Sequence, residues 1–136
     1  MYRTKVNVLL VDDDTIYQFV SRKTLEATGH ADKITICSNG EEAFHFLENN
    51  MHSISELPDI ILLDVNMPVM NGWEFLDAYQ SLKPNLSKEI HVFLVTSSMN
   101  DQDRDYSRRY DCVEDYIVKP LDRMKISDLL SHTVPV

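Results

Sequence analysis

The sequence predicts an α/β fold in which one parallel sheet of five strands is covered by five helices. Short aliphatic runs alternate along the chain with longer segments whose apolar residues recur at helical spacing. The run at 60–63 contains only Ile and Leu, which is typical of a strand buried on both faces of a parallel sheet. Right-handed crossovers between such strands place the helices on both sides of the sheet.

The first half of the chain predicts two strand and helix pairs. Residues 6–11 are rich in β-branched residues and bounded by charge, so they form the first strand. A helix follows over about 15–28 and stops at Gly29. Its apolar residues at helical spacing are Ile16, Phe19, Val20 and Ala27. A second strand at 33–37 leads through the turn at 38–40 into a helix that carries Ala43, Phe44, Phe46 and Leu47.

The central part of the chain predicts a third pair. The connection at 49–58 consists largely of polar, small and turn residues, so we expect it to be exposed. The third strand ends at Asp64, and Pro68 with the Asn71-Gly72 turn separates it from the next helix. That helix presents Trp73, Leu76, Tyr79 and Leu82 on one face.

The remaining elements are a strand at 90–95, a helix at 100–110, a strand at 115–118 and a last helix. The segment at 100–110 is heavily charged and has few apolar residues, so we expect a poorly anchored, mobile helix on the surface. The core residues expected in the last helix are Met124, Ile126, Leu129 and Leu130.

Length and composition are those of one soluble globular domain. The chain has 136 residues, of which 43% are hydrophobic and 26% charged, so we expect a single domain over 1–136 without an output domain. The net charge of −9 argues against direct nucleic-acid binding and favours metal cations or basic partners. The first apolar run is too short to span a bilayer and leads into Asp12, so we expect a cytoplasmic protein without membrane insertion.

Polar and charged residues follow the predicted strands at one edge of the sheet. They are Asp12, Asp13, Asp64, Thr96 and Lys119. Each alone has an ordinary alternative as a cap, turn or surface residue. Because crowded carboxylates repel one another, a divalent cation such as Mg²⁺ would keep them ionised. With a lysine and a hydroxyl at the same edge, the set indicates a phosphoryl-transfer site.

These residues and their neighbours resemble the receiver domain of two-component response regulators. The matching motifs are Val11-Asp12-Asp13, Asp64 with Met67-Pro68 and Gly72, Thr96, and Tyr116 ahead of Lys119-Pro120. The resemblance covers essentially the whole chain and is to the stand-alone, chemotaxis-regulator-like form. It implies a flavodoxin-like, doubly wound sheet with strand order 2-1-3-4-5, and a cis bond before Pro120.

The resemblance also implies a role for each site residue. Asp64 would accept a phosphoryl group from a sensor histidine kinase or a histidine phosphotransfer protein. Mg²⁺ would be held by Asp12, Asp13, Asp64 and the backbone carbonyl of Asn66. Lys119 would pair with one phosphoryl oxygen and Thr96 would hydrogen-bond another. The domain would thus catalyse its own phosphorylation and slow dephosphorylation without being an enzyme in the usual sense.

Signalling is implied to run through Thr96 and Tyr116. Thr96 would move toward the phosphoryl group, Tyr116 would turn inward, and the surface near the fourth helix and fifth strand would change. The downstream protein target is not identified by the sequence, which also allows a homodimer. Asp14 matches no functional position of the family, so we expect it to cap the first helix.

Three departures from the family pattern and two alternative functions stand beside this interpretation. Ser97 replaces the usual alanine, residues 111–114 replace a Gly-Ala pair, and the connection around His52 is long. The main alternative is a haloacid-dehalogenase-type phosphatase with Asp12 as its nucleophile, disfavoured by Ile16 in its motif and by the short chain. The other is a receiver-like binding module that is not phosphorylated, which the full set of site residues disfavours.

Overall fold

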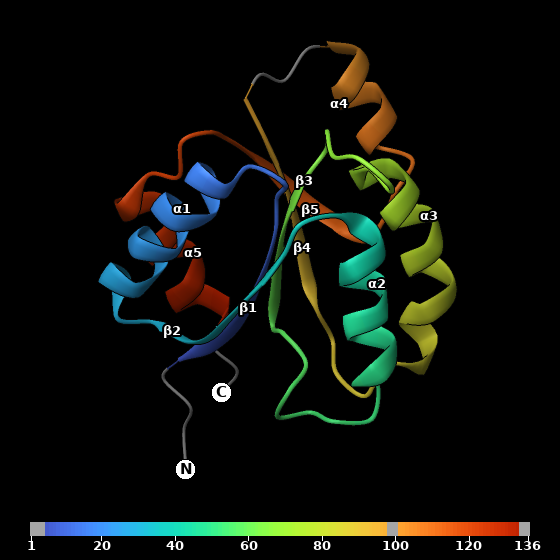
Figure 1. The fold of residues 1–136 in the computed structure, drawn as a ribbon, viewed down its shortest axis with the longest axis horizontal. Coiled ribbons are helices and arrows are strands. Elements are labelled where there is room, and N and C mark those ends of the chain that lie inside the picture. Colours follow the sequence, from blue (N-terminus) through green and yellow to red (C-terminus); the bar gives the residue numbers. More distant parts are fainter. Residues whose placement is uncertain (1–4, 98–100, 134–136) are drawn as a thin grey trace.

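The computed structural model describes residues 5–97 and 101–133 and contains a five-stranded parallel sheet with strand order β2-β1-β3-β4-β5 (Figure 1). The strands are β1 (Val6–Val11), β2 (Ala31–Cys37), β3 (Ile60–Asp64), β4 (His91–Thr96) and β5 (Val113–Val118). The helices are α1 (Thr15–Thr28), α2 (Gly40–Asn49), α3 (Gly72–Leu82), α4 (Asp101–Ser107) and α5 (Arg123–Thr133), with a short 3₁₀ helix at Lys83–Asn85. The predicted fold class and strand order are confirmed.

The central strand β3 is buried on both faces, as its aliphatic run predicts. Ile61 and Leu63 pack into a core with α2 and α3, whereas Ile60 and Leu62 pack into a second core with α1 and α5. Figure 1 shows these two pairs of helices on opposite faces of the sheet. None of the described helices is long and apolar enough to cross a membrane.

The strand register brings the carboxyl ends of β1, β3, β4 and β5 to one edge. Leu63 of β3 pairs with Val11 of β1, so Asp64 and Asp12 each follow a paired residue at the same level. On the other side, Thr96 of β4 pairs with Val118 of β5, which precedes Lys119. The alternation of strands and helices therefore gathers residues that are far apart in the sequence.

The apolar residues at helical spacing in α1 do not mark its buried face. All four apolar residues at helical spacing are exposed, namely Ile16, Phe19, Val20 and Ala27. Ile16 is 74% exposed, and the buried residues of the helix are Ser21 and Leu25. Helical spacing identifies residues that share a face, but the packing of α1 against the sheet and α5 decides which face is covered.

Two further burial predictions are corrected. Met124 is 81% exposed at the start of α5, while Ile126 and Leu130 are buried and Leu129 packs against them, as predicted. The connection after α2 is not wholly exposed, because Leu57 is fully buried.

The same connection carries a buried polar network. Asp59 is buried, and its carboxylate accepts a hydrogen bond from the Asn7 backbone N–H at 2.8 Å. Lys88 Nζ lies 3.1 Å from Asp59 Oδ1 and also donates to the Leu57 carbonyl at 2.9 Å. These bonds tie the amino-terminal edge of the sheet to its loops.

Aromatic contacts attach α4 and its following turn to α3, contrary to the expectation of a poorly anchored helix. The Trp73 ring lies edge-on to Tyr106 at 4.7 Å between centroids and stacks on Tyr110 at 5.9 Å. Tyr110 is buried and donates a hydrogen bond of 2.8 Å to Asp77 of α3. A few large aromatic side chains thus anchor a mostly charged segment. Asn100, its predicted first residue, lies outside the described residues.

Candidate functional site

The loop after β1 is organised by short-range hydrogen bonds that hold Asp12. The Asp12 N–H donates to the Cys37 carbonyl at 3.0 Å, and its own carbonyl accepts from Gln18 Nε2 at 2.6 Å. Asp12 Oδ1 accepts from the Asp14 N–H at 3.0 Å. The Asp14 carboxylate in turn accepts from the N–H groups of Ile16 and Tyr17, which confirms that Asp14 caps α1.

Gly72 explains how the backbone around Asp64 is held. A Cβ atom at Gly72 would lie 2.6 Å from the Asp64 carbonyl oxygen and 2.9 Å from the Val65 Cα. The Gly72 N–H donates to the Val65 carbonyl at 2.9 Å. Because only glycine permits this approach, α3 begins directly against the end of β3 and fixes the strand end that displays Asp64.

The loop between β3 and α3 has an unusual backbone conformation. Val69 has a φ of 68°, a left-handed conformation that is unfavourable for a β-branched residue. The Met70 N–H donates to the Pro68 carbonyl at 2.7 Å, and the Gly40 N–H donates to the Met70 carbonyl at 2.9 Å. The loop beside Asp64 is therefore connected to the first turn of α2.

Lys119 reaches from the end of β5 to the two buried carboxylates. Its side chain is 8% exposed, and Nζ lies 2.8 Å from Asp12 Oδ2 and 3.4 Å from Asp64 Oδ2. The Lys119 N–H donates to the Thr96 carbonyl at 2.7 Å, which joins the ends of β4 and β5. The peptide bond between Lys119 and Pro120 is cis, as predicted.

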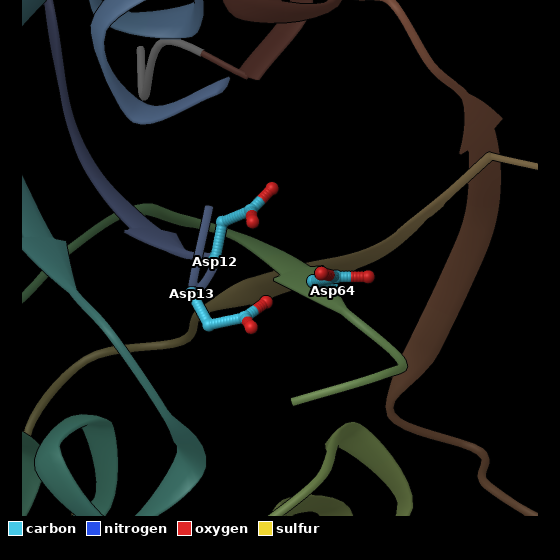
Figure 2. Close-up of side chains that lie close together, drawn as sticks. All are labelled: Asp12, Asp13 and Asp64. Carbon is cyan, nitrogen blue, oxygen red and sulfur yellow. The ribbon is translucent and has the colours of Figure 1, made fainter. Parts of the chain in front are cut away.

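Figure 2 shows the carboxylates of Asp12 and Asp13 in the loop after β1, beside that of Asp64 at the end of β3. One carboxylate oxygen from each residue lies within 4.8 Å of the other two. Asp12 and Asp64 are buried whereas Asp13 is exposed, so the group is open to solvent on one side. Hard oxygen ligands with room for water and phosphate oxygens fit the requirements of Mg²⁺. The Asn66 N–H lies 3.4 Å from Asp64 Oδ1, and the role of its carbonyl stays a prediction.

Burial and charge act on the ionisation of the site in opposite directions. Desolvation raises the pKa of Asp64 above its ordinary value, and the charge of Asp12 raises it further. The Lys119 ammonium and the Asn66 N–H lower it, but by less. For Lys119, burial lowers the pKa, but the hydrogen bond to Asp12 and the charges of Asp64 and Asp12 outweigh it, so the net shift is upward. The ammonium is therefore retained within the site.

Thr96 and Tyr116 occupy neighbouring strands. Thr96 is buried as the last residue of β4, and Tyr116 of β5 is partly buried opposite Leu94. The guanidinium of Arg104 in α4 lies 5.3 Å from the centroid of the Tyr116 ring. The position predicted for the switch is thus in contact with α4.

The structure brings together Asp12, Asp13, Asp64 and Lys119, with Thr96 joined to Lys119 through the backbone. Sequence reasoning missed two contributors in α1. Gln18 holds the Asp12 carbonyl, and the Tyr17 ring lies 4.3 Å from Lys119 Nζ. The available signal was their place in the first turn of the helix that follows the acidic loop, where side chains lie near the sheet edge.

The model of the response regulator receiver domain family matches residues 8–131. The chain belongs to this family. Among solved structures, a two-component response regulator from Cytophaga hutchinsonii is 30% identical with a TM-score of 0.83, over 95% of this chain and 97% of the other. The chemotaxis protein CheY4 of Vibrio cholerae is 26% identical with a TM-score of 0.73, over 96% of this receiver and 99% of the other chain.

Curated relatives differ in how much of their length this receiver spans. An uncharacterised 14.6 kDa protein of Leptolyngbya boryana is 29% identical over 94% of this chain and 89% of its own length. A protein-glutamate methylesterase/protein-glutamine glutaminase of Bacillus licheniformis is 31% identical, but the receiver spans only 35% of it. Hybrid signal transduction histidine kinase I of Dictyostelium discoideum is 27% identical, and the receiver spans 7% of its length. The last two relatives are therefore much longer than this receiver, which matches only one part of each.

Proposed function

We propose that this receiver accepts a phosphoryl group on Asp64 from a phosphohistidine of a sensor histidine kinase or a histidine phosphotransfer protein. The observation that carries the proposal is the position of Asp64, which ends the central strand with its carboxylate 3.4 Å from Lys119 Nζ. An Asp64 carboxylate oxygen would form a bond to phosphorus while the P–N bond to histidine breaks. The electron pair of that bond stays on the imidazole nitrogen, and the product is an acyl phosphate.

The buried lysine and threonine supply the remaining protein groups. The Lys119 ammonium, which pairs with Asp12, would also pair with one phosphoryl oxygen, and the Thr96 hydroxyl would donate a hydrogen bond to another. Phosphoryl transfer needs little from a protein except positioning and charge neutralisation, and this edge provides both. The domain would in this way catalyse its own phosphorylation and slow dephosphorylation.

Asp12, Asp13 and Asp64, together with the backbone carbonyl of Asn66, would hold Mg²⁺. The support is the donor set, in which three carboxylates contribute oxygens within 4.8 Å of one another. When bound, the ion supplies positive charge that stabilises the charge developing on the transferring group. The exposed position of Asp13 leaves the site accessible to a phosphodonor.

The proposed partners are supported by the relatives of the chain, and the proposed location by its cysteines. Histidine kinases are among the relatives. The sensor histidine kinase CheAY of Helicobacter pylori is 30% identical over 93% of this receiver, which spans 15% of the kinase. We propose a cytoplasmic location, which suits the two free, buried cysteines Cys37 and Cys112. A downstream protein would bind the surface near α4 and β5. The receiver itself would act as a monomer or a homodimer. The single-domain organisation stays a prediction.

Signalling would couple the site to that surface through Thr96 and Tyr116. Thr96 ends β4 beside the site, and Tyr116 contacts Arg104 of α4. A phosphoryl group that draws Thr96 toward itself would favour an inward Tyr116 and a rearranged α4. The group can shift this equilibrium only by as much as it interacts differently with the two states.

No observation favours the phosphatase alternative. Asp12, its required nucleophile, is buried and paired with Lys119 at 2.8 Å, and it accepts a further hydrogen bond from the Asp14 N–H. These contacts occupy both carboxylate oxygens of Asp12, whereas the carboxylate of Asp64 lies farther from Lys119 Nζ, at 3.4 Å.

Intact-mass measurement after incubation with acetyl phosphate and Mg²⁺ tests the proposed function. We expect a gain of one phosphoryl group in the wild type and none in Asp64→Asn, because the amide is not a nucleophile of comparable strength. Asp32→Asn, which changes an exposed acid of β2, is the matched control and should label normally. An unlabelled wild type, or an adduct on Asp12, would overturn the proposal. Repeated hydrolysis of a phosphate ester would support the phosphatase instead.

A further inference from the structure

The Lys119 ammonium has a third neighbour besides the two carboxylates. Its Nζ lies 4.3 Å from the centroid of the Tyr17 ring, in the first turn of α1. Asp12 and Asp64 take up two of its three N–H donors, at 2.8 and 3.4 Å. The ring therefore helps to enclose a side chain that is 8% exposed.

We propose that Tyr17 is a positioning residue that holds the Lys119 ammonium in place for phosphoryl transfer. The inference rests on the proposed function and adds to it a residue outside the acidic loop. The negative face of an aromatic ring attracts a cation, and the attraction strengthens when both groups are withdrawn from water. Unlike a third carboxylate, the ring adds no negative charge near the incoming phosphoryl group.

The position of Tyr17 favours this role over ordinary packing. Neither of the two hydrophobic cores of the described residues includes Tyr17. The Tyr17 N–H is bonded to the Asp14 carboxylate at 3.1 Å, so the start of the helix does not depend on the ring. Replacing the side chain should leave the fold and the Asp12 loop intact.

Tyr17→Leu removes the ring and Tyr17→Phe retains it. We expect the second-order rate of labelling by acetyl phosphate at saturating Mg²⁺ to fall about fivefold in Tyr17→Leu, because the ammonium then samples unproductive positions. Tyr17→Phe should stay near the wild-type rate. Phe19→Leu is the matched control, because the Phe19 ring lies on the same helix with its centroid 5.6 Å from Lys23 Nζ. This variant should also label at the wild-type rate.

A double substitution tests whether Tyr17 acts through Lys119. In a Lys119→Met background, Tyr17→Leu should cause no further loss, since the group that it positions is gone. An equal loss in both backgrounds would overturn the inference and assign Tyr17 a role independent of the lysine. Unchanged labelling in Tyr17→Leu would overturn it as well, while leaving phosphorylation of Asp64 intact.

Nuclear magnetic resonance tests the contact between Lys119 and the Tyr17 ring in the wild type. This measurement needs no phosphorylation and no substitution of Tyr17. A methylene next to an ammonium that faces an aromatic ring is shifted upfield by the ring current. We expect the ε-methylene signal missing from Lys119→Met spectra to lie upfield of the lysines that face no aromatic ring in the unphosphorylated wild type. An unshifted signal would overturn the inference even if Asp64 is labelled. Absence of labelling with a shifted signal would instead reject the proposed function.

Discussion

Lys119 Nζ lies 2.8 Å from Asp12 Oδ2 and 3.4 Å from Asp64 Oδ2, so the ammonium is held mainly by Asp12 rather than by the proposed acceptor. The Asp64 carboxylate is consequently buried with incomplete compensation, and desolvation and Asp12 together raise its pKa. A poorly compensated carboxylate at neutral pH reduces the stability of the folded state.

Replacing Asp64 should therefore stabilise the metal-free protein. The folded pKa of Asp64 lies above its ordinary value of 3.8, so the folded state retains a proton that the unfolded chain has released. Stability falls as pH rises through that interval, and the cost is complete above the folded pKa. We expect Asp64→Asn to raise the free energy of unfolding in urea near neutral pH, with a gain that shrinks in mild acid. Asp13→Asn, at an exposed position, should show a smaller gain; equal gains would contradict this reasoning.

Removing Asp13 should weaken Mg²⁺ binding without preventing phosphorylation. The variant loses one ligand and one negative charge of the proposed site, so Asp13→Ala should need roughly tenfold or more Mg²⁺ for half-maximal labelling. The measurement is the labelling rate by acetyl phosphate across a Mg²⁺ titration. Asp32→Ala removes the same charge from β2 and should follow the wild-type curve. An unaltered Mg²⁺ dependence in Asp13→Ala would exclude Asp13 as a ligand.

The backbone at Val69 should be a source of strain beside the acceptor. A φ of 68° is unfavourable for valine, whereas asparagine adopts this region readily. Because the side chain is exposed, Val69→Asn loses little packing and should raise the free energy of unfolding by about 1 kcal/mol. Urea denaturation measures the change. Val69→Ile keeps the β-branch and should give no gain, and a similar gain in both variants would point to a cause other than backbone strain.

Thr96 should couple the phosphorylated site to α4. Beryllofluoride, which stands in for the phosphoryl group on Asp64, should change amide chemical shifts both around Asp64 and at Tyr116 and α4 in the wild type. Thr96→Ala should retain the first set of changes and lose the second, because the distant response depends on differential interaction with Thr96. As a control, Thr24→Ala removes a hydroxyl that bonds within α1 and should behave as the wild type. Wild-type changes confined to the loops around Asp64 would show that output uses another face.

The order of strands and helices and the convergence of their polar ends could be predicted from the amino-acid sequence alone. These features follow from local chemistry, since the aliphatic run before Asp64 and the Asn71-Gly72 turn set where one strand ends and the next helix begins. Parallel strands joined by helical crossovers then share one carboxyl edge, so Asp12, Asp64 and Lys119 were predictable as neighbours. The family resemblance supplied the strand order and the expected roles.

The covered side of each helix and the contacts that complete the site depend on how the segments pack together, and they could not be predicted. Nothing in the sequence shows that the apolar residues of α1 and Met124 are exposed. Their burial depends on where the sheet and the neighbouring helix lie. The anchoring of α4 arises from Trp73, which is distant in sequence from Tyr110. For the same reason Tyr17 became visible as a neighbour of Lys119 only in three dimensions. Periodicity is a property of one segment, whereas burial and side-chain contacts are properties of several segments packed together.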